Sequence, residues 1–141
     1  MSEYRYVLDT YAILTVIEDE PGAQTVAEII TTQGAMLYLS IISLGEIYYI
    51  LLRRRGEQAA EEVVQNTLAE QSLALVEVTW PKVKDAARIK AIGGLSYADS
   101  FVLALGKELN APVVTGDPEI NAIARETGVE IIWIGPAEGH L

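Results

Sequence analysis

The stretch APVVTGDPEI, residues 111–120, decides the fold expected for this protein. Residues 113–115 are typical of a short apolar strand, and the Asp117-Pro118 pair that follows is typical of a helix start, with a side-chain acceptor at the N-cap and a proline at the first helical position. A strand that leads directly into a helix is the repeating unit of α/β proteins. The stretch also places two carboxylates, Asp117 and Glu119, after a buried strand. These two carboxylates either stabilise the start of the helix or belong to a functional site.

The same alternation of strands and helices continues along the chain. Strands are expected at residues 4–9, 36–39, 73–78, 113–115 and 131–134. Helices are expected at residues 10–18, 22–32, about 41–55, about 57–70, 81–91, 96–109 and 118–127. Strands rich in valine, isoleucine and leucine that alternate with helices predict a mainly parallel five-stranded sheet covered on both faces, which is a three-layer α/β/α sandwich. We expect one domain over residues 1–141.

The amino-acid composition and the net charge exclude several kinds of site and of partner. The 141 residues include no cysteine, which excludes disulfides, thiolate nucleophiles and zinc-thiolate sites, and which favours a reducing cytoplasm together with the missing signal peptide. The net charge of −10 disfavours a general affinity for nucleic acid or anionic membrane. Eight of the ten basic residues lie between Arg53 and Lys107, so either a local positive face or an ordinary solvated helix surface is expected there.

One apolar run, residues 35–52, is long enough to suggest a membrane span and is followed by three arginines. Glu46 argues against this interpretation, because a carboxylate near the centre of a bilayer is costly. Gly34, Ser40 and Ser43 allow the run to divide into a strand and a helix. We therefore expect no membrane association.

Four carboxylates from separate parts of the chain are expected to meet. Asp9 ends the first strand and Asp117 follows the fourth, so both belong at the edge of the sheet where parallel strands finish, which is where ligands bind in such folds. Asp99 lies in the first turn of one helix and Glu46 in the early part of another, and such helices start at the same edge.

Helix capping is the alternative for each of these acids. Asp9 can cap the helix that starts at Thr10, and both Ser43-x-x-Glu46 and Ser96-x-x-Asp99 match a capping-box pattern. Glu46 distinguishes the two interpretations, because it is the only charged group between Met36 and Leu52 and is expected to be partly buried. A buried, unpaired carboxylate near other acids is unfavourable, and a divalent cation would relieve the conflict. Oxygen ligands alone suit Mg²⁺ or Mn²⁺.

These motifs resemble those of the PIN-domain ribonucleases, and most closely the VapC-type toxins of toxin-antitoxin systems. The resemblance covers essentially the whole chain and rests on YVLDTYAIL, SLGEIYYIL, LSYADSFVLALGKELNAPVVT and TGDPEI, in this order. It implies the PIN-like form of the expected sandwich and a set of metal ligands: Asp9, Glu46, Asp99 and Asp117. Glu119 occupies the place of a second acid found in many relatives, or is an exposed residue of the last helix. Thr115 matches a small hydroxyl residue that would orient Asp117 or a water, or is an ordinary strand-end threonine.

The resemblance also implies an activity and partners. The expected activity is that of a Mg²⁺- or Mn²⁺-dependent endoribonuclease that hydrolyses phosphodiester bonds of single-stranded or loop RNA, as the toxin of a type II toxin-antitoxin pair. The expected partners are an RNA substrate, a small antitoxin protein and a second copy in a homodimer. The only histidine is His140, which excludes a mechanism based on a histidine pair. Hydrolysis would use water activated by one or two ions.

The residues that contact RNA are open at this stage. Candidates for phosphate contacts are Arg53, Arg54, Arg55, Lys82, Lys84 and Arg88. Tyr11 and Tyr97 lie two positions from proposed ligands and would stack on unpaired bases, although packing is the commoner role of such tyrosines. Apolar residues on the helices over 41–70 would face partner proteins, or the chain's own sheet.

Three other functions are compatible with acids at strand ends. A receiver-like binding module would bind magnesium, but VVTGD lacks the lysine expected after a late strand, and Glu46 would be unexplained. A phosphatase with an aspartate nucleophile would need a second aspartate two residues after Asp9, where Tyr11 stands. A catalytically inactive PIN-like scaffold would not need the four acids that this chain retains.

Overall fold

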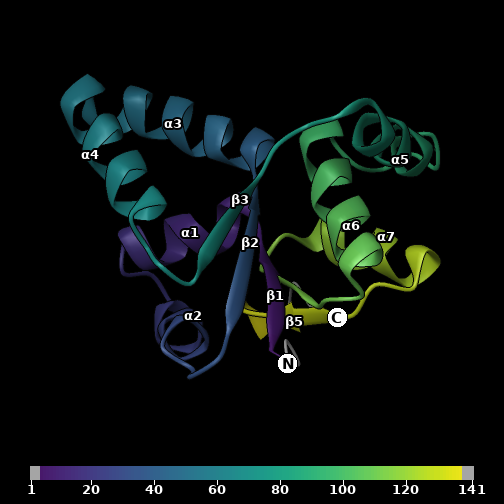
Figure 1. Ribbon diagram of the computed structural model, residues 1–141, viewed down its shortest axis with the longest axis horizontal. Coiled ribbons are helices and arrows are strands. Elements are labelled where there is room, and N and C mark those ends of the chain that lie inside the picture. Colours follow the sequence, from purple (N-terminus) through teal and green to yellow (C-terminus); the bar gives the residue numbers. More distant parts are fainter. Residues whose placement is uncertain (1–3, 138–141) are drawn as a thin grey trace.

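The computed structural model describes residues 4–137 (Figure 1). Its strands are β1 (Arg5–Leu8), β2 (Met36–Ser40), β3 (Leu73–Val76), β4 (Val113–Thr115) and β5 (Ile131–Trp133). Its helices are α1 (Thr10–Ile17), α2 (Ala23–Ile30), α3 (Ile41–Arg55), α4 (Glu57–Leu68), α5 (Trp80–Lys90), α6 (Tyr97–Leu109) and α7 (Pro118–Thr127).

The strands form one sheet in the order β3-β2-β1-β4-β5, and every pair is parallel. The central strand β1 pairs with β2 on one side and with β4 on the other, with Leu8 opposite both Leu39 and Val114. The chain therefore builds the sheet outward from β1 in two directions. In open α/β sheets the ligand lies beyond the carboxyl ends of the strands at such a reversal, here between β1 and β4.

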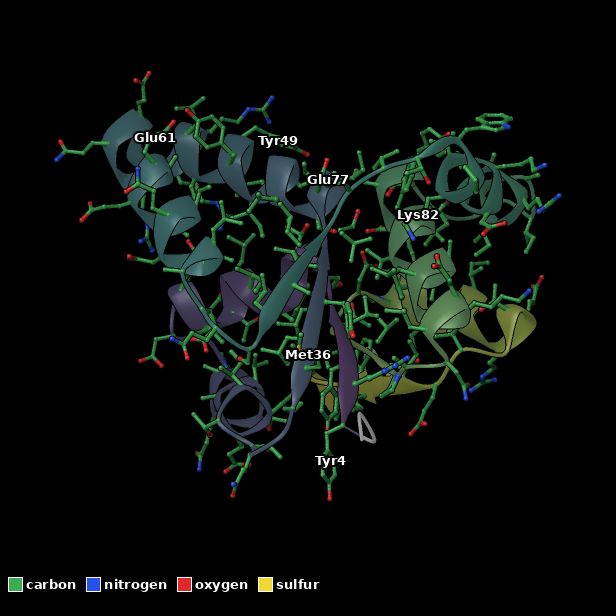
Figure 2. The ribbon with its side chains drawn as sticks, viewed as in Figure 1. Tyr4, Met36, Tyr49, Glu61, Glu77 and Lys82 are labelled. Carbon is green, nitrogen blue, oxygen red and sulfur yellow. The ribbon has the colours of Figure 1, made fainter. Side chains whose placement is uncertain are left out.

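Helices cover both faces of this sheet (Figure 1). Val7 and Val113 face a core formed with α5, α6 and α7, whereas Leu8 and Val114 face a core formed with α1, α2, α3 and α4. This division follows from the strand period of two, which turns successive side chains to opposite faces. Figure 2 shows side chains filling the space between the sheet and the helices on both sides. The expected α/β/α sandwich is confirmed, with a sheet that is parallel throughout.

The apolar run at residues 35–52 divides as expected, because it forms β2 and the first part of α3. Within residues 4–137, no helix combines the length and the apolar character that crossing a bilayer requires. The expected boundaries differ from the observed ones by up to two residues. For example, β3 ends at Val76 rather than at residue 78, and α5 begins at Trp80 rather than at Pro81.

Helix α6 packs closely against β4, and Gly106 makes this contact possible. A Cβ atom at Gly106 would lie 2.8 Å from Cγ2 of Val113 and 3.1 Å from Cγ1 of Val129. On α3, by contrast, a Cβ atom at Gly45 would have no neighbour within 4 Å. The two helical glycines therefore form a matched pair of sites for testing the packing of α6.

We predict that Gly106→Ala destabilises the protein and that Gly45→Ala stabilises it. Overpacking at Gly106 costs about 1–3 kcal/mol and outweighs the gain in helix propensity, whereas Gly45→Ala has only that gain, about 0.5–1 kcal/mol. Urea denaturation measures both free energies of unfolding. Equal stabilisation by the two substitutions would contradict the close packing of α6 on β4.

Candidate functional site

Asp9 lies at the centre of the edge where β1 and β4 end. Its side chain is 2 % exposed. As the N-cap of α1, it accepts a hydrogen bond at Oδ1 from the Ala12 amide, at 2.8 Å. Its Oδ2 accepts a second, short hydrogen bond from the Thr115 hydroxyl. The expected capping role and a place in the site are therefore compatible, since the cap uses only one of the two oxygens.

Thr115 links the two strands through their register. Because Leu8 pairs with Val114, Asp9 and Thr115 follow at adjacent positions on neighbouring strands. The Thr115 hydroxyl donates to Asp9 and accepts a hydrogen bond from the Asp117 amide, at 3.0 Å. Thr115 thus contacts the side chain of Asp9 and the backbone of Asp117, and its supporting role in the site stays a prediction.

Three further carboxylates converge at this edge, and two of them, Asp99 and Asp117, lie near enough to Asp9 to interact with it electrostatically. Asp99, Asp117 and Glu119 each have a carboxylate oxygen within 4.8 Å of those of the other two. Asp117 is the N-cap of α7, where its Oδ1 accepts from the Glu119 amide at 2.8 Å, and Pro118 occupies the first turn as expected. Asp99 and Asp117 are partly buried, whereas Glu119 is exposed.

Glu46 approaches the group from α3. It is partly buried, as expected, but it is not unpaired, because its Oε1 accepts a hydrogen bond from the Thr10 hydroxyl at 2.8 Å. Its negative charge contributes to the raised pKa of Asp99. The five predicted residues therefore lie at one edge of the sheet, and their role as metal ligands stays a prediction.

Burial and mutual repulsion hold two of these acids far from their ordinary titration range. Burial raises the pKa of Asp9 to about 7, although the hydrogen bonds from Thr115 and Ala12 oppose the rise. Burial, followed by the negative charge of Asp117, raises the pKa of Asp99 to about 7. A cation at this position would favour the charged forms of both groups.

One of the expected caps is wrong. Ser43 does not cap α3, because the helix begins at Ile41 and its N-cap is Ser40, whose hydroxyl accepts from the Ile42 amide. The hydroxyl of Ser43 is buried and has no hydrogen-bond partner among the described residues. In α6, Ser96 is the N-cap and accepts from the Asp99 amide at 3.1 Å, so half of the expected capping box is present.

Most of the candidate RNA-binding cations contact groups of the protein itself. Arg54 and Arg55 pair with Glu18, Lys82 with Glu108, and Arg88 with Asp85. Arg53 lies over the ring of Tyr49, at 5.4 Å from its centroid. These contacts favour the interpretation of a solvated helix surface for most of the basic residues.

Two contributors were missed in the sequence. Thr10 holds Glu46, and the signal for it was a hydroxyl residue immediately after Asp9. Gly116 immediately precedes Asp117, and a Cβ atom there would lie 2.3 Å from Cε1 of Tyr11 and 2.9 Å from Cα of Gly135. No local sequence pattern indicates that residue 116 must lack a side chain, because Tyr11 and Gly135, which a Cβ atom there would meet, are remote in sequence.

The raised pKa of Asp99 predicts how the metal-free protein responds to pH. A carboxyl group whose pKa rises on folding stabilises the folded state below its unfolded value, and this contribution is lost as pH rises through about 7. Asp99→Asn should remove the loss, so its Tm relative to the wild type should increase from pH 4 to pH 8. Thermal denaturation in EDTA measures the effect, with Glu126→Gln on the exposed face of α7 as the control. The same pH dependence in both variants would contradict it.

Comparison with known proteins identifies the family. A search among curated proteins finds no significant sequence match. VapBC2 from Rickettsia felis, solved with promoter DNA, has a TM-score of 0.71 at 13 % identity over 91 % of this chain and 97 % of its own. VapC20 from Mycobacterium tuberculosis, described as a Sarcin-Ricin loop cleaving toxin, has a TM-score of 0.70 at 17 % identity over 83 % of this chain and 93 % of its own. DNA-bound VapBC from Salmonella typhimurium has a TM-score of 0.69 at 18 % identity over 94 % of this chain and 98 % of its own. At these identities the structures show a shared fold. The PIN domain model matches residues 6–126, and the chain therefore belongs to the PIN domain family.

Proposed function

We propose that this protein is a metal-dependent endoribonuclease and the toxin of a toxin-antitoxin pair. The observation that carries the proposal is the convergence of Asp99, Asp117 and Glu119, with carboxylate oxygens within 4.8 Å of one another, beside the buried Asp9. Membership of the PIN domain family and the fold shared with VapC20 support a nuclease. We propose that residues 1–141 form one such domain.

The residues present fit a hard divalent cation. The donor set consists of carboxylate oxygens, the ligands that Mg²⁺ and Mn²⁺ accept. Burial, together with the negative charges of neighbouring acids, raises the pKa of Asp9 and of Asp99 to about 7, and such an ion would stabilise the charged forms of both groups. We propose as ligands Asp9, Glu46, Asp99 and Asp117, with Glu119 as a further ligand.

Different side chains would have different roles in hydrolysis. When bound, the cation would supply positive charge that screens the phosphate and lowers the pKa of water in the site. Thr115 holds the Asp9 carboxylate in one orientation, and Thr10 does the same for Glu46. Glu119 is exposed, so it is placed to meet substrate at the mouth of the site. Without a cation this edge repels phosphate, so substrate binding depends on the ion.

RNA is the substrate that we infer. The relative from Mycobacterium tuberculosis is described as cleaving the Sarcin-Ricin loop, which supports an RNA substrate with an accessible loop. The net charge of −10 is compatible with this substrate only if the metal provides local attraction.

We also infer a small antitoxin and a second copy of the chain as partners. Similar structures are VapBC complexes, which supports a partner protein of the antitoxin type. The outer face of α3 carries Ile41, Tyr49 and Leu52, which are 36 %, 46 % and 39 % exposed. Tyr49 points away from the sheet in Figure 2. Such exposed apolar groups on one helix are available for contacts between proteins.

The nuclease proposal predicts metal-dependent cutting. Purified protein free of antitoxin should cleave a pool of structured and unstructured RNAs with Mg²⁺ or Mn²⁺ and should stop in EDTA. Asp99→Asn should lower kcat by at least about 100-fold, since the charge stabilisation that metals provide is worth several kcal/mol. Glu126→Gln should cleave like the wild type. A folded, metal-binding protein that cuts no RNA in the pool would favour the scaffold function instead.

The role of Thr115 predicts a matched pair of variants. Thr115→Val removes the hydroxyl that orients Asp9 and should weaken Mn²⁺ binding by about 10- to 100-fold, whereas Thr115→Ser should retain most of the affinity. Isothermal titration calorimetry measures the affinity independently of catalysis. Equal affinities for the valine and serine variants would contradict the positioning role.

A further inference from the structure

An open groove lies beside the carboxylates, between α1 and the segment that follows β5. Its volume is about 730 Å³. It is lined by two aromatic side chains, Tyr11 and Trp133, together with polar groups that include Glu18, Glu20 and Arg54. None of these residues is a proposed metal ligand, so the groove is not part of the carboxylate cluster.

Tyr11 connects the groove to the carboxylates. It lies two residues after Asp9 in α1 and lines the groove while half-buried. Its ring packs against Gly116, where a Cβ atom would lie 2.3 Å from Cε1. Since Gly116 immediately precedes Asp117, the aromatic wall and the acidic site share one stretch of backbone.

Trp133 forms a second aromatic wall with a fixed orientation. Its Nε1 donates a hydrogen bond to the Pro136 carbonyl at 3.0 Å. The indole also lies close to Gly135, where a Cβ atom would be 2.8 Å from Cζ2 and 2.9 Å from Cα of Gly116. Glycine backbones at 116 and 135 therefore meet behind the two rings. Rings that are held before binding lose little entropy when a planar ligand stacks on them.

The polar groups of the groove suit a nucleobase better than a phosphate. Arg54 already pairs with Glu18, and Arg55 lies 3.7 Å from the same carboxylate. Glu20 is exposed and also lines the groove. The groove thus offers aromatic faces and carboxylate acceptors. Acceptors of this type pair with the exocyclic amino groups of bases, as glutamate does with the N4 amino group of cytosine.

We propose that the groove binds one unpaired base of the RNA strand, adjacent to the phosphate at the carboxylates, and that Tyr11, Trp133 and Glu20 determine its identity. This proposal rests on the proposed nuclease function, because it names the part of the substrate that lies beside the cut. The expected base carries an exocyclic amino group, so adenine, cytosine and guanine are preferred to uracil.

Binding of labelled RNA hexanucleotides tests the proposal. The full-length protein carries Asp99→Asn so that the strand stays intact, and fluorescence anisotropy in Mg²⁺ gives the Kd for rA₆, rC₆ and rU₆. Tyr11→Leu and Trp133→Leu should each weaken binding of rA₆ and rC₆ by about 5- to 100-fold, the effect expected of losing a stacked base. Trp80→Leu removes an exposed aromatic residue outside the groove and should have less than about a twofold effect. Glu20→Gln should reduce the preference over rU₆.

Two more measurements distinguish a base-binding role of the aromatic residues from a structural one. In a Trp80→Phe background, bound RNA should quench the fluorescence of Trp133, which a structural role would not produce. In the Asp99-containing enzyme, Tyr11→Leu should raise KM more than it lowers kcat, while Tyr11→Phe stays near the wild type. If Tyr11→Leu does not fold, RNA binding by Trp133→Leu and the quenching of Trp133 fluorescence still test the proposal.

The outcomes separate this proposal from the nuclease function. RNA cleavage that is unaffected by both aromatic variants, with no quenching, would overturn the base site and leave the nuclease intact. Aromatic-dependent RNA binding without any cleavage would support the base site while contradicting the nuclease. Equal binding of all hexanucleotides by the control and groove variants would overturn the proposal and leave the groove to a protein partner.

Discussion

The hydrogen bond from Thr115 to Asp9 is the interaction on which the site depends. It joins the ends of β1 and β4, and it satisfies a carboxylate that is 2 % exposed. Among residues 4–137, the Ala12 amide is the only other group that donates to this carboxylate. A buried acid without hydrogen bonds is costly. The same hydroxyl accepts from the Asp117 amide, so a single threonine sets the positions of two acids on two elements.

The topology of the sheet explains why the acids gather there. β1 is central, and the chain extends the sheet from it toward β2 and β3 on one side and toward β4 and β5 on the other. The helices that follow β1 and β4 diverge to opposite faces, so their N-termini leave room between them for side chains. Burial at this edge, with the negative charges of neighbouring acids added to it, raises the pKa of Asp9 and of Asp99 to about 7. Strained groups of this kind cluster at functional sites, where a ligand relieves the strain.

Several residues combine a structural contact with a position at the candidate site. Asp9 and Asp117 are helix N-caps, yet each keeps a carboxylate oxygen beyond the one used for capping. The aromatic ring of Tyr11 packs on Gly116 and also lines the neighbouring groove. A cap can therefore belong to a metal site, because capping uses one lone pair of a group that has several. A capping role for these acids therefore does not exclude their proposed role as metal ligands.

Local signals were sufficient to predict the order of the elements, the parallel α/β class and the candidate acids, because hydrophobic periodicity, Asp-Pro caps and glycine stops can be recognised within short stretches of sequence. The prediction for Ser43 was wrong, since a hydroxyl three residues before an acid resembles a cap wherever the helix actually begins. The contacts that hold the acids in place could be identified only from the tertiary structure. The partners Thr10–Glu46 and Thr115–Asp9 are 36 and 106 residues apart, so no local pattern reports them. Strand register and helix packing bring them together, and these arise from the burial of whole faces rather than from any short motif.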